Sequence, residues 1–151
     1  MSLKEIDGNL IELFQQGEFD IIIHQCNCFN TMGAGIAAII AQQYPEVEAA
    51  DQATRIGDIN KLGSSIPVET KDGIVVNLYT QYSTGMRFGV PTSYLALHEG
   101  LRALAKQYKG KRIGTYQLGC NLGGADWAVV RNILVNTLCH QNDVTIVNYN
   151  G

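Results

Sequence analysis

The sequence lacks the features that mark exported, membrane and metal-binding proteins. Residues 1–5 hold no long apolar stretch after a basic cluster, so no secretory signal is visible. No window approaches the roughly 18–20 apolar residues that span a bilayer. The four cysteines form no CxxC pair, and the three histidines add no familiar zinc spacing. We therefore expect a cytoplasmic protein with reduced thiols that needs no membrane, metal or cofactor.

An excess of positive charge is also missing. The 11 lysines and arginines stand against 14 aspartates and glutamates, which gives a net charge of −3 at pH 7. A protein that depends on electrostatic attraction to duplex DNA should be basic, so this class is disfavoured, although a local basic patch stays open. The 151 residues are 46% hydrophobic and 17% charged, which is typical of a folded protein. We expect a single domain over residues 1–151 and a monomer.

Apolar patterns predict strands that alternate with helices. We expect strands over residues 2–6, 19–25, 65–69, 74–79, 111–118 and 144–149, and helices over residues 9–16, 34–44, 46–55, 92–108 and 126–140. The unbroken run Ile21-Ile22-Ile23 indicates a strand buried on both faces. Lys71-Asp72-Gly73 is a hairpin signal. This order predicts a three-layer α/β/α sandwich, an α/β fold whose sheet is mostly parallel but mixed.

Two strand–loop–helix units place glycines at the carboxyl end of a strand. The first glycine loop is Thr31-Met32-Gly33-Ala34-Gly35-Ile36, and the second is Gly119-Cys120-Asn121-Leu122-Gly123-Gly124. Without a Cβ atom the backbone can approach a ligand closely, and the following helix start offers N–H donors that suit phosphate. Either loop alone is typical of a simple helix entry. Together they favour a site that holds a diphosphate from two sides.

Two other nucleotide-binding patterns do not fit. The string Gly33-Ala34-Gly35-Ile36-Ala37-Ala38 matches GxGxxA, but polar or small residues separate it from its strand, and the next segment reads as another helix. An NAD-dependent oxidoreductase is therefore not expected. No GxxxxGK[ST] string is present, which excludes a P-loop.

Several stretches, taken in order and spacing, resemble the macrodomain family, which binds ADP-ribose. They are Asp7-Gly8-Asn9-Leu10, Ile23-His24-Gln25-Cys26-Asn27-Cys28, Met32-Gly33-Ala34-Gly35-Ile36-Ala37, the second glycine loop up to Trp127, and Ile146-Val147-Asn148-Tyr149. They are similar to the branch of ADP-ribose 1″-phosphate phosphatases and terminal ADP-ribosyl-glutamate hydrolases. The resemblance implies a macrodomain fold and ADP-ribose or ADP-ribose 1″-phosphate as the small-molecule partner. Nucleic acid would be a partner only as an ADP-ribosylated substrate.

The resemblance also implies which residues bind the ligand. Asn9 and Leu10 would contact adenine, although the family more often has aspartate at the first of these positions. Tyr149 would pack on the adenine ring, and Asn27 would meet the distal ribose or its phosphate. The two glycine loops would supply the remaining contacts: Thr31, Met32, Gly33, Ala34, Gly35, Ile36, Leu118, Cys120, Asn121, Leu122, Gly123 and Gly124.

Two positions depart from the pattern of the glutamate hydrolases. Where those enzymes have a nucleophilic lysine and an aspartate, this chain has Gln81 and Gly123, and an amide cannot form a Schiff base. The His-x-Cys-Asn-Cys string is closer to the phosphatases. The resemblance therefore favours an enzyme that hydrolyses ADP-ribose 1″-phosphate to ADP-ribose and phosphate. The alternatives are a non-catalytic ADP-ribose reader and a hydrolase that removes ADP-ribose from modified protein or nucleic acid.

Three residues are candidates for catalysis, and each has a structural alternative. His24 could act as a general acid or base near neutral pH, or it could be a core histidine that fixes the first loop. Asn27 could orient the ribose hydroxyls or make a turn. Asp126 could hold a water or cap the last helix. We expect His98 and His140 to be structural.

Overall fold

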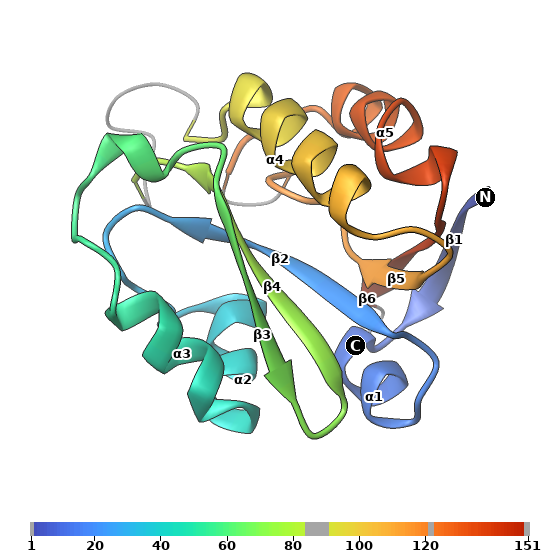
Figure 1. Ribbon diagram of the computed structural model, residues 1–151, viewed down its shortest axis with the longest axis horizontal. Coiled ribbons are helices and arrows are strands. Elements are labelled where there is room, and N and C mark those ends of the chain that lie inside the picture. The colour runs from blue at the N-terminus through green and yellow to red at the C-terminus, as the bar shows by residue number, and fades with distance from the viewer. Residues whose placement is uncertain (1, 84–90, 121–122, 150–151) are drawn as a thin grey trace.

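A computed structural model describes residues 2–83, 91–120 and 123–149 of the chain (Figure 1). Within these ranges the strands form one sheet in the order β1-β6-β5-β2-β4-β3. The strands are β1 (Ser2–Gly8), β2 (Ile21–Asn27), β3 (Ser65–Thr70), β4 (Gly73–Gln81), β5 (Arg112–Thr115) and β6 (Asp143–Tyr149). Neighbours run parallel except in the β3–β4 hairpin, which confirms the predicted mixed sheet.

Helices cover both faces of this sheet. One face carries α1 (Leu10–Gln15), α2 (Gly35–Gln43) and α3 (Pro45–Gln52), and the other carries α4 (Tyr94–Gln107) and α5 (Trp127–Val135) (Figure 1). Two 3₁₀ turns, η1 (Ile59–Lys61) and η3 (Leu138–His140), follow α3 and α5. The predicted three-layer α/β/α sandwich is confirmed. In the described part of the chain, no helix has both the length and the apolar character needed to cross a membrane.

Strand β2 lies at the centre of the structure and contributes to both halves of the core. Ile21 and Ile23 pack in the cluster that includes residues of α4 and α5, whereas Ile22 packs in the cluster that includes residues of α1, α2 and α3. All three side chains are at most 1% exposed. The continuous isoleucine run is therefore explained by a strand with helices on both sides.

Strand β5 is shorter than predicted, ending at Thr115 rather than at residue 118. The reason is that side chains take over the hydrogen bonds beyond this point. The Thr115 hydroxyl donates to the Ile23 carbonyl at 2.8 Å, and the Gln25 N–H donates to the Tyr116 hydroxyl at 2.9 Å. The chain thereby leaves the sheet early and enters the second glycine loop.

The last helix also ends early, at Val135, and not at residue 140. Asn136 and Thr137 follow, and both side chains bond back to the helix: Asn136 Nδ2 donates to the Asn132 carbonyl at 2.8 Å, and Thr137 Oγ1 donates to the Ile133 carbonyl at 2.7 Å. Such local bonds compete with continued helix. The chain then makes the short turn η3.

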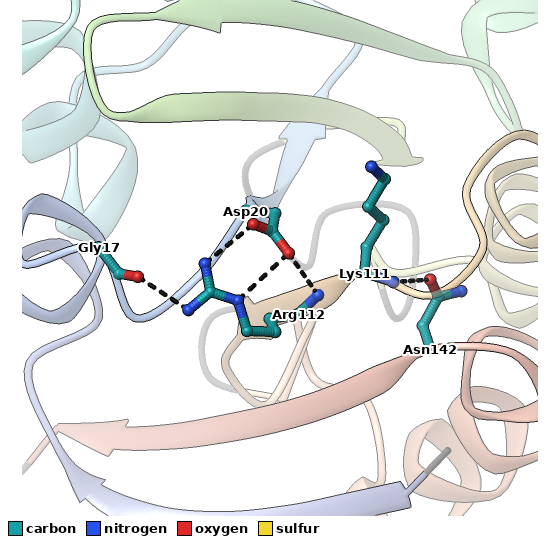
Figure 2. A network of polar contacts seen from close by, with 5 residues as sticks. All are labelled: Gly17, Asp20, Lys111, Arg112 and Asn142. Atoms are coloured by element: carbon teal, nitrogen blue, oxygen red, sulfur yellow. Dashed lines mark hydrogen bonds and ion pairs between the residues drawn. The ribbon is translucent and has the colours of Figure 1, made fainter.

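A polar network fastens the amino ends of β2 and β5 (Figure 2). The Arg112 guanidinium contacts both Asp20 carboxylate oxygens, at 2.9 and 3.3 Å, and donates to the Gly17 carbonyl at 3.0 Å. The Arg112 side chain holds the pKa of Asp20 below its ordinary value. Beside it, the Lys111 N–H donates to Asn142 Oδ1 at 3.0 Å. This network lies at the amino ends of the strands, so it leaves the carboxyl ends available for a ligand.

Candidate functional site

The two glycine loops leave the sheet from adjacent strands. Strand β2 leads into the first loop and β5 leads into the second, and β2 pairs directly with β5 in parallel orientation. Parallel neighbours end at the same edge of the sheet, which in open α/β sheets is the edge where ligands bind. This adjacency is what a diphosphate held between the loops requires.

The first glycine loop presents an open backbone. A Cβ atom built on Gly33 would have no neighbour within 4 Å, and Gly35 has a φ of +58° that favours glycine. Helix α2 begins at Gly35, and its N-cap residue Ala34 has no side chain that accepts a cap hydrogen bond. Met32 is only 5% exposed and anchors the loop in the core. An anion at this position would meet unshielded N–H groups.

Asn27 shapes the entry to this loop. Its Nδ2 atom donates to the Thr31 carbonyl at 3.0 Å and to Thr31 Oγ1 at 2.9 Å. Its Oδ1 atom accepts from the Phe29 N–H at 2.8 Å. The structure thus gives Asn27 the turn role, and its half-buried side chain remains at the carboxyl end of β2.

Gly119 and Gly123, in the described parts of the second loop, both contact Thr92. The Thr92 N–H donates to the Gly123 carbonyl at 3.2 Å, and its hydroxyl donates to the Gly119 carbonyl at 3.3 Å. Gln25 of β2 donates through Nε2 to the same hydroxyl at 3.0 Å. The Ala125 N–H closes the loop by donating to the Gly119 carbonyl at 2.8 Å. These contacts tie the second loop to the strand that carries the first.

Gly123 has no room for a side chain. A Cβ atom there would overlap Thr92 Oγ1 and come within 2.5 Å of the Gly119 carbonyl oxygen. An aspartate, as in the hydrolase pattern, would not fit at this position in this structure. Gly119 and Gly124 have φ values of +73° and +71°, and Leu118 is fully buried. The predicted ligand residues Asn121 and Leu122 lie outside the described residues.

The predicted adenine residues lie together at the outer edge. Gly8 pairs with Tyr149 in the β1–β6 register, and Asn9 follows Gly8 directly. Tyr149 is 74% exposed, which leaves its ring available for stacking. Asn9 Oδ1 accepts from the Glu12 N–H at 3.1 Å and so caps α1. Leu10 is buried in the core at 5% exposure.

A hollow of about 360 Å³ joins this edge to the second loop. Its lining residues come from the carboxyl ends of β5 and β6: Tyr116, Gln117, Cys120, Val147, Asn148 and Tyr149. Tyr116, Gln117 and Asn148 were not predicted from the sequence as site residues. Their position directly after or at the end of a strand is the signal that would have found them.

His24 does not line this hollow. Strand β2 continues two residues beyond its predicted end, to Asn27, so His24 lies within the strand. Its ring is fully buried, with Nε2 at 2.5 Å from Asn77 Oδ1 and 3.6 Å from Cys26 Sγ. Asn77 in turn donates to the Val47 carbonyl of α3 at 3.2 Å. Burial lowers the pKa of His24 to about 4, so the imidazole is neutral at pH 7. This geometry favours the core role over the catalytic one.

Asp126 and Gln81 occupy defined positions at the site edge. Asp126 caps α5, since Oδ1 accepts from the Ala128 N–H at 2.9 Å, and its side chain is exposed. Its own N–H donates to the Tyr94 hydroxyl at 2.9 Å. Gln81 lies opposite Asn27 in the β2–β4 register and donates through Nε2 to the Ser83 carbonyl at 2.5 Å. No amine stands at the lysine position.

Comparison with known proteins places the chain in a family. No protein-family model matches it. It is 32% identical over 158 residues to an uncharacterized 17.5 kDa protein from the tk-vs intergenic region of Enterobacteria phage T4, covering 99% of this chain and 97% of that protein. The chain belongs to the family of this phage protein.

Comparison with solved structures identifies the fold of the chain. The macrodomain of Mycobacterium tuberculosis DarG superposes with a TM-score of 0.75 at 21% identity, over 97% of both chains. Thermosipho africanus DarTG, solved in complex with ADP-ribose, gives a TM-score of 0.75 at 16% identity, over 97% of this chain and 42% of that one. The expected macrodomain fold is confirmed.

A more distant sequence relative is the DNA ADP-ribosyl glycohydrolase of Mycobacterium tuberculosis. It is 25% identical over 138 residues, which cover 89% of this chain. The chain spans 39% of the length of that protein.

A buried lysine in this macrodomain fold contacts the entry to the first loop. Lys61 is 8% exposed, and its Nζ atom donates to Asn30 Oδ1 at 2.7 Å and to Thr54 Oγ1 at 3.0 Å. Asn30 has a φ of +57° and directly precedes the first loop. Lys61 thus holds the loop entry. All four cysteines are free, and the described residues contain no group of three or more His, Cys, Asp or Glu side chains that could hold a metal ion.

Proposed function

We propose that this chain binds ADP-ribose along the carboxyl ends of β2, β5 and β6, a surface that we call the ADP-ribose crevice and that includes the hollow between Tyr116 and Tyr149. One observation carries the proposal: the open backbone at Gly33, next to an α2 start without a side-chain cap, leaves the sheet beside the strand that leads to the second loop. The shared fold with a chain solved in complex with ADP-ribose supports it.

The parts of the nucleotide fit the site in a definite order. The pyrophosphate lies against the N–H groups of the first loop, where a helix start favours negative charge. The adenine stacks on the exposed ring of Tyr149. The distal ribose then lies between Asn27 and the second loop, at the end of the crevice that Asp126 borders.

We further propose that the chain hydrolyses the bond at C1″ of the distal ribose, with ADP-ribosylated DNA as the preferred substrate. The mycobacterial relatives, which are DNA ADP-ribosyl glycohydrolases, support this substrate. The water oxygen bonds to C1″, the bond from C1″ to its substituent breaks, and one water proton passes to the leaving group by way of the Asp126 carboxylate. No Schiff base forms, because Gln81 stands at the lysine position.

The role of Asp126 can be separated from its capping role. Asparagine is as good an N-cap as aspartate, so Asp126→Asn keeps the start of α5 and removes only the carboxylate. We expect this variant to melt like the wild type and to release ADP-ribose from an ADP-ribosylated single-stranded oligonucleotide at least about tenfold more slowly, since general acid–base groups contribute about 10²–10⁴-fold. An unchanged rate would remove Asp126 from the mechanism.

A second candidate reaction is hydrolysis of ADP-ribose 1″-phosphate, which the His-x-Cys-Asn-Cys string at His24–Cys28 favours. The two substrates are compared in parallel at equal concentration, with phosphate release measured for one and ADP-ribose release for the other. If phosphate is released faster than ADP-ribose, ADP-ribose 1″-phosphate would be the preferred substrate instead of ADP-ribosylated DNA. Binding of ADP-ribose with neither product formed would identify a reader.

A further inference from the structure

A second hollow, of about 460 Å³, lies between α4 and the segment that includes η3. Its lining includes Arg102, Lys106, Lys109, His98 and His140, and no carboxylate. Three of the chain's 11 lysines and arginines and two of its three histidines therefore line one concave surface of a protein with a net charge of −3. This concentration makes it a basic groove, the local basic patch that composition left open.

Within the described residues, the lysines and arginine of the basic groove form no ion pair with the rest of the fold. Arg102, Lys106 and Lys109 are exposed, and within residues 2–83, 91–120 and 123–149 none of them forms an ion pair. Like charges four residues apart on a helix, as at Arg102 and Lys106, are mildly destabilising. Lys106 suits the last turn of α4, but the helix dipole does not account for Arg102, which lies a full turn earlier. The groove is therefore suited to an external anion.

The basic side chains of the groove are arranged as a row that begins near the ADP-ribose crevice. His98, Arg102 and Lys106 are spaced four residues apart on α4, which places them on one face at steps of about 6 Å. One turn before the row, Tyr94 accepts from the Asp126 N–H at the end of the second loop and is 38% exposed. Figure 1 shows α4 and α5 side by side on this face of the sheet.

An exposed aromatic ring followed by evenly spaced basic side chains matches a strand of nucleic acid. Its phosphates repeat regularly, and its unpaired bases stack on aromatic rings. We propose that the basic groove binds the phosphate backbone of a single-stranded nucleic acid, running from Tyr94 along α4 toward Lys109. The further idea that the bound strand delivers an ADP-ribosylated nucleotide to the crevice rests on the proposed function. The contact between the groove and the phosphate backbone is independent of the proposed function.

The test measures binding of an unmodified, fluorescently labelled oligothymidine by anisotropy over a series of salt concentrations. The groove variant is Arg102→Gln, Lys106→Gln, Lys109→Gln. Its matched control is Lys4→Gln, Arg55→Gln, Lys71→Gln, three exposed cations on other elements that bring the chain to the same net charge. Thermal melting and calorimetric titration with ADP-ribose are recorded for every variant.

We expect the groove variant to bind the oligothymidine at least about tenfold more weakly and to reduce the salt slope by about 2, since each single-strand phosphate contact contributes about 0.7. The control should bind like the wild type. The proposal would be overturned if both variants lost the same affinity, or if the wild type did not bind the oligothymidine at low salt. It would also be overturned if the wild type bound polyglutamate, a polyanion without bases, as tightly as the oligothymidine. If only the groove variant loses oligothymidine binding while the wild type fails to bind ADP-ribose, the proposed function is refuted and the groove proposal stands.

Discussion

The burial of His24 makes a quantitative prediction that separates its core role from a catalytic one. In the folded chain burial lowers its pKa from 6.5 to about 4. The folded state therefore binds fewer protons than the unfolded state between these two values, so stability rises with pH. The stabilisation is fully present above pH 6.5 and is lost as pH falls toward 4. At 1.36 kcal/mol for each pH unit, the loss is about 3 kcal/mol.

The perturbation is His24→Leu, which fills the site with an apolar side chain that does not titrate. The variant leaves Asn77 Oδ1 without its donor, so it should be less stable at pH 7 by about 1–3 kcal/mol. Its free energy of unfolding should also fall less between pH 7 and pH 4 than that of the wild type, by about 3 kcal/mol. Other groups, such as Asp20, titrate in both proteins and cancel in the difference.

Urea unfolding at half-unit pH steps from 4 to 7.5 measures this difference directly. Release of ADP-ribose from the ADP-ribosylated oligonucleotide is measured in the same buffers, at a temperature where both proteins are folded. We expect the rate of the His24→Leu variant to stay within about threefold of the wild-type rate. Parallel stability profiles for the two proteins would refute the burial argument. A large loss of turnover in a fully folded variant would show that His24 takes part in catalysis.

Three further substitutions test the loops and the adenine edge. Gly123→Ala forces a Cβ atom onto Thr92 Oγ1, and we expect the free energy of unfolding to fall by about 1–3 kcal/mol; unchanged thermal melting would contradict the packing described for the second loop. Gly33→Ala meets nothing within 4 Å, so melting should stay the same while calorimetry shows weaker ADP-ribose binding; full affinity would mean that the pyrophosphate does not approach this backbone. Tyr149→Ala removes a 74% exposed ring and should weaken ADP-ribose binding about tenfold or more, since stacking on an aromatic ring contributes about 1–3 kcal/mol; equal loss of AMP binding is expected, and unaltered affinity for both would place adenine elsewhere.

Local sequence patterns predicted most of the fold, because they report on burial and turn chemistry. The isoleucine run of β2, the β3–β4 hairpin and the apolar stripe of α4 are properties of neighbouring residues. The early end of β5 is not, since it depends on the Tyr116 hydroxyl that meets Gln25, 91 residues away in the sequence.

The site was predictable to the extent that it is made of backbone. Both glycine loops stand out in the sequence, and the pairing of β2 with β5 brings their strands together. The environment of His24 was not predictable, because its partner Asn77 is 53 residues away. The basic groove was only partly predictable: the spacing of Arg102 and Lys106 on α4 is local, but the other side of the groove, around η3, meets them only in the folded chain.

The most direct test of the central claim is a crystal structure of the chain grown with ADP-ribose. We predict density for the nucleotide along the carboxyl ends of β2, β5 and β6, with its pyrophosphate within hydrogen-bond distance of the backbone N–H groups at Gly33–Ile36 and its adenine against Tyr149. A crystal in which this crevice holds only water at saturating nucleotide, or in which the nucleotide binds at another surface, would contradict the account.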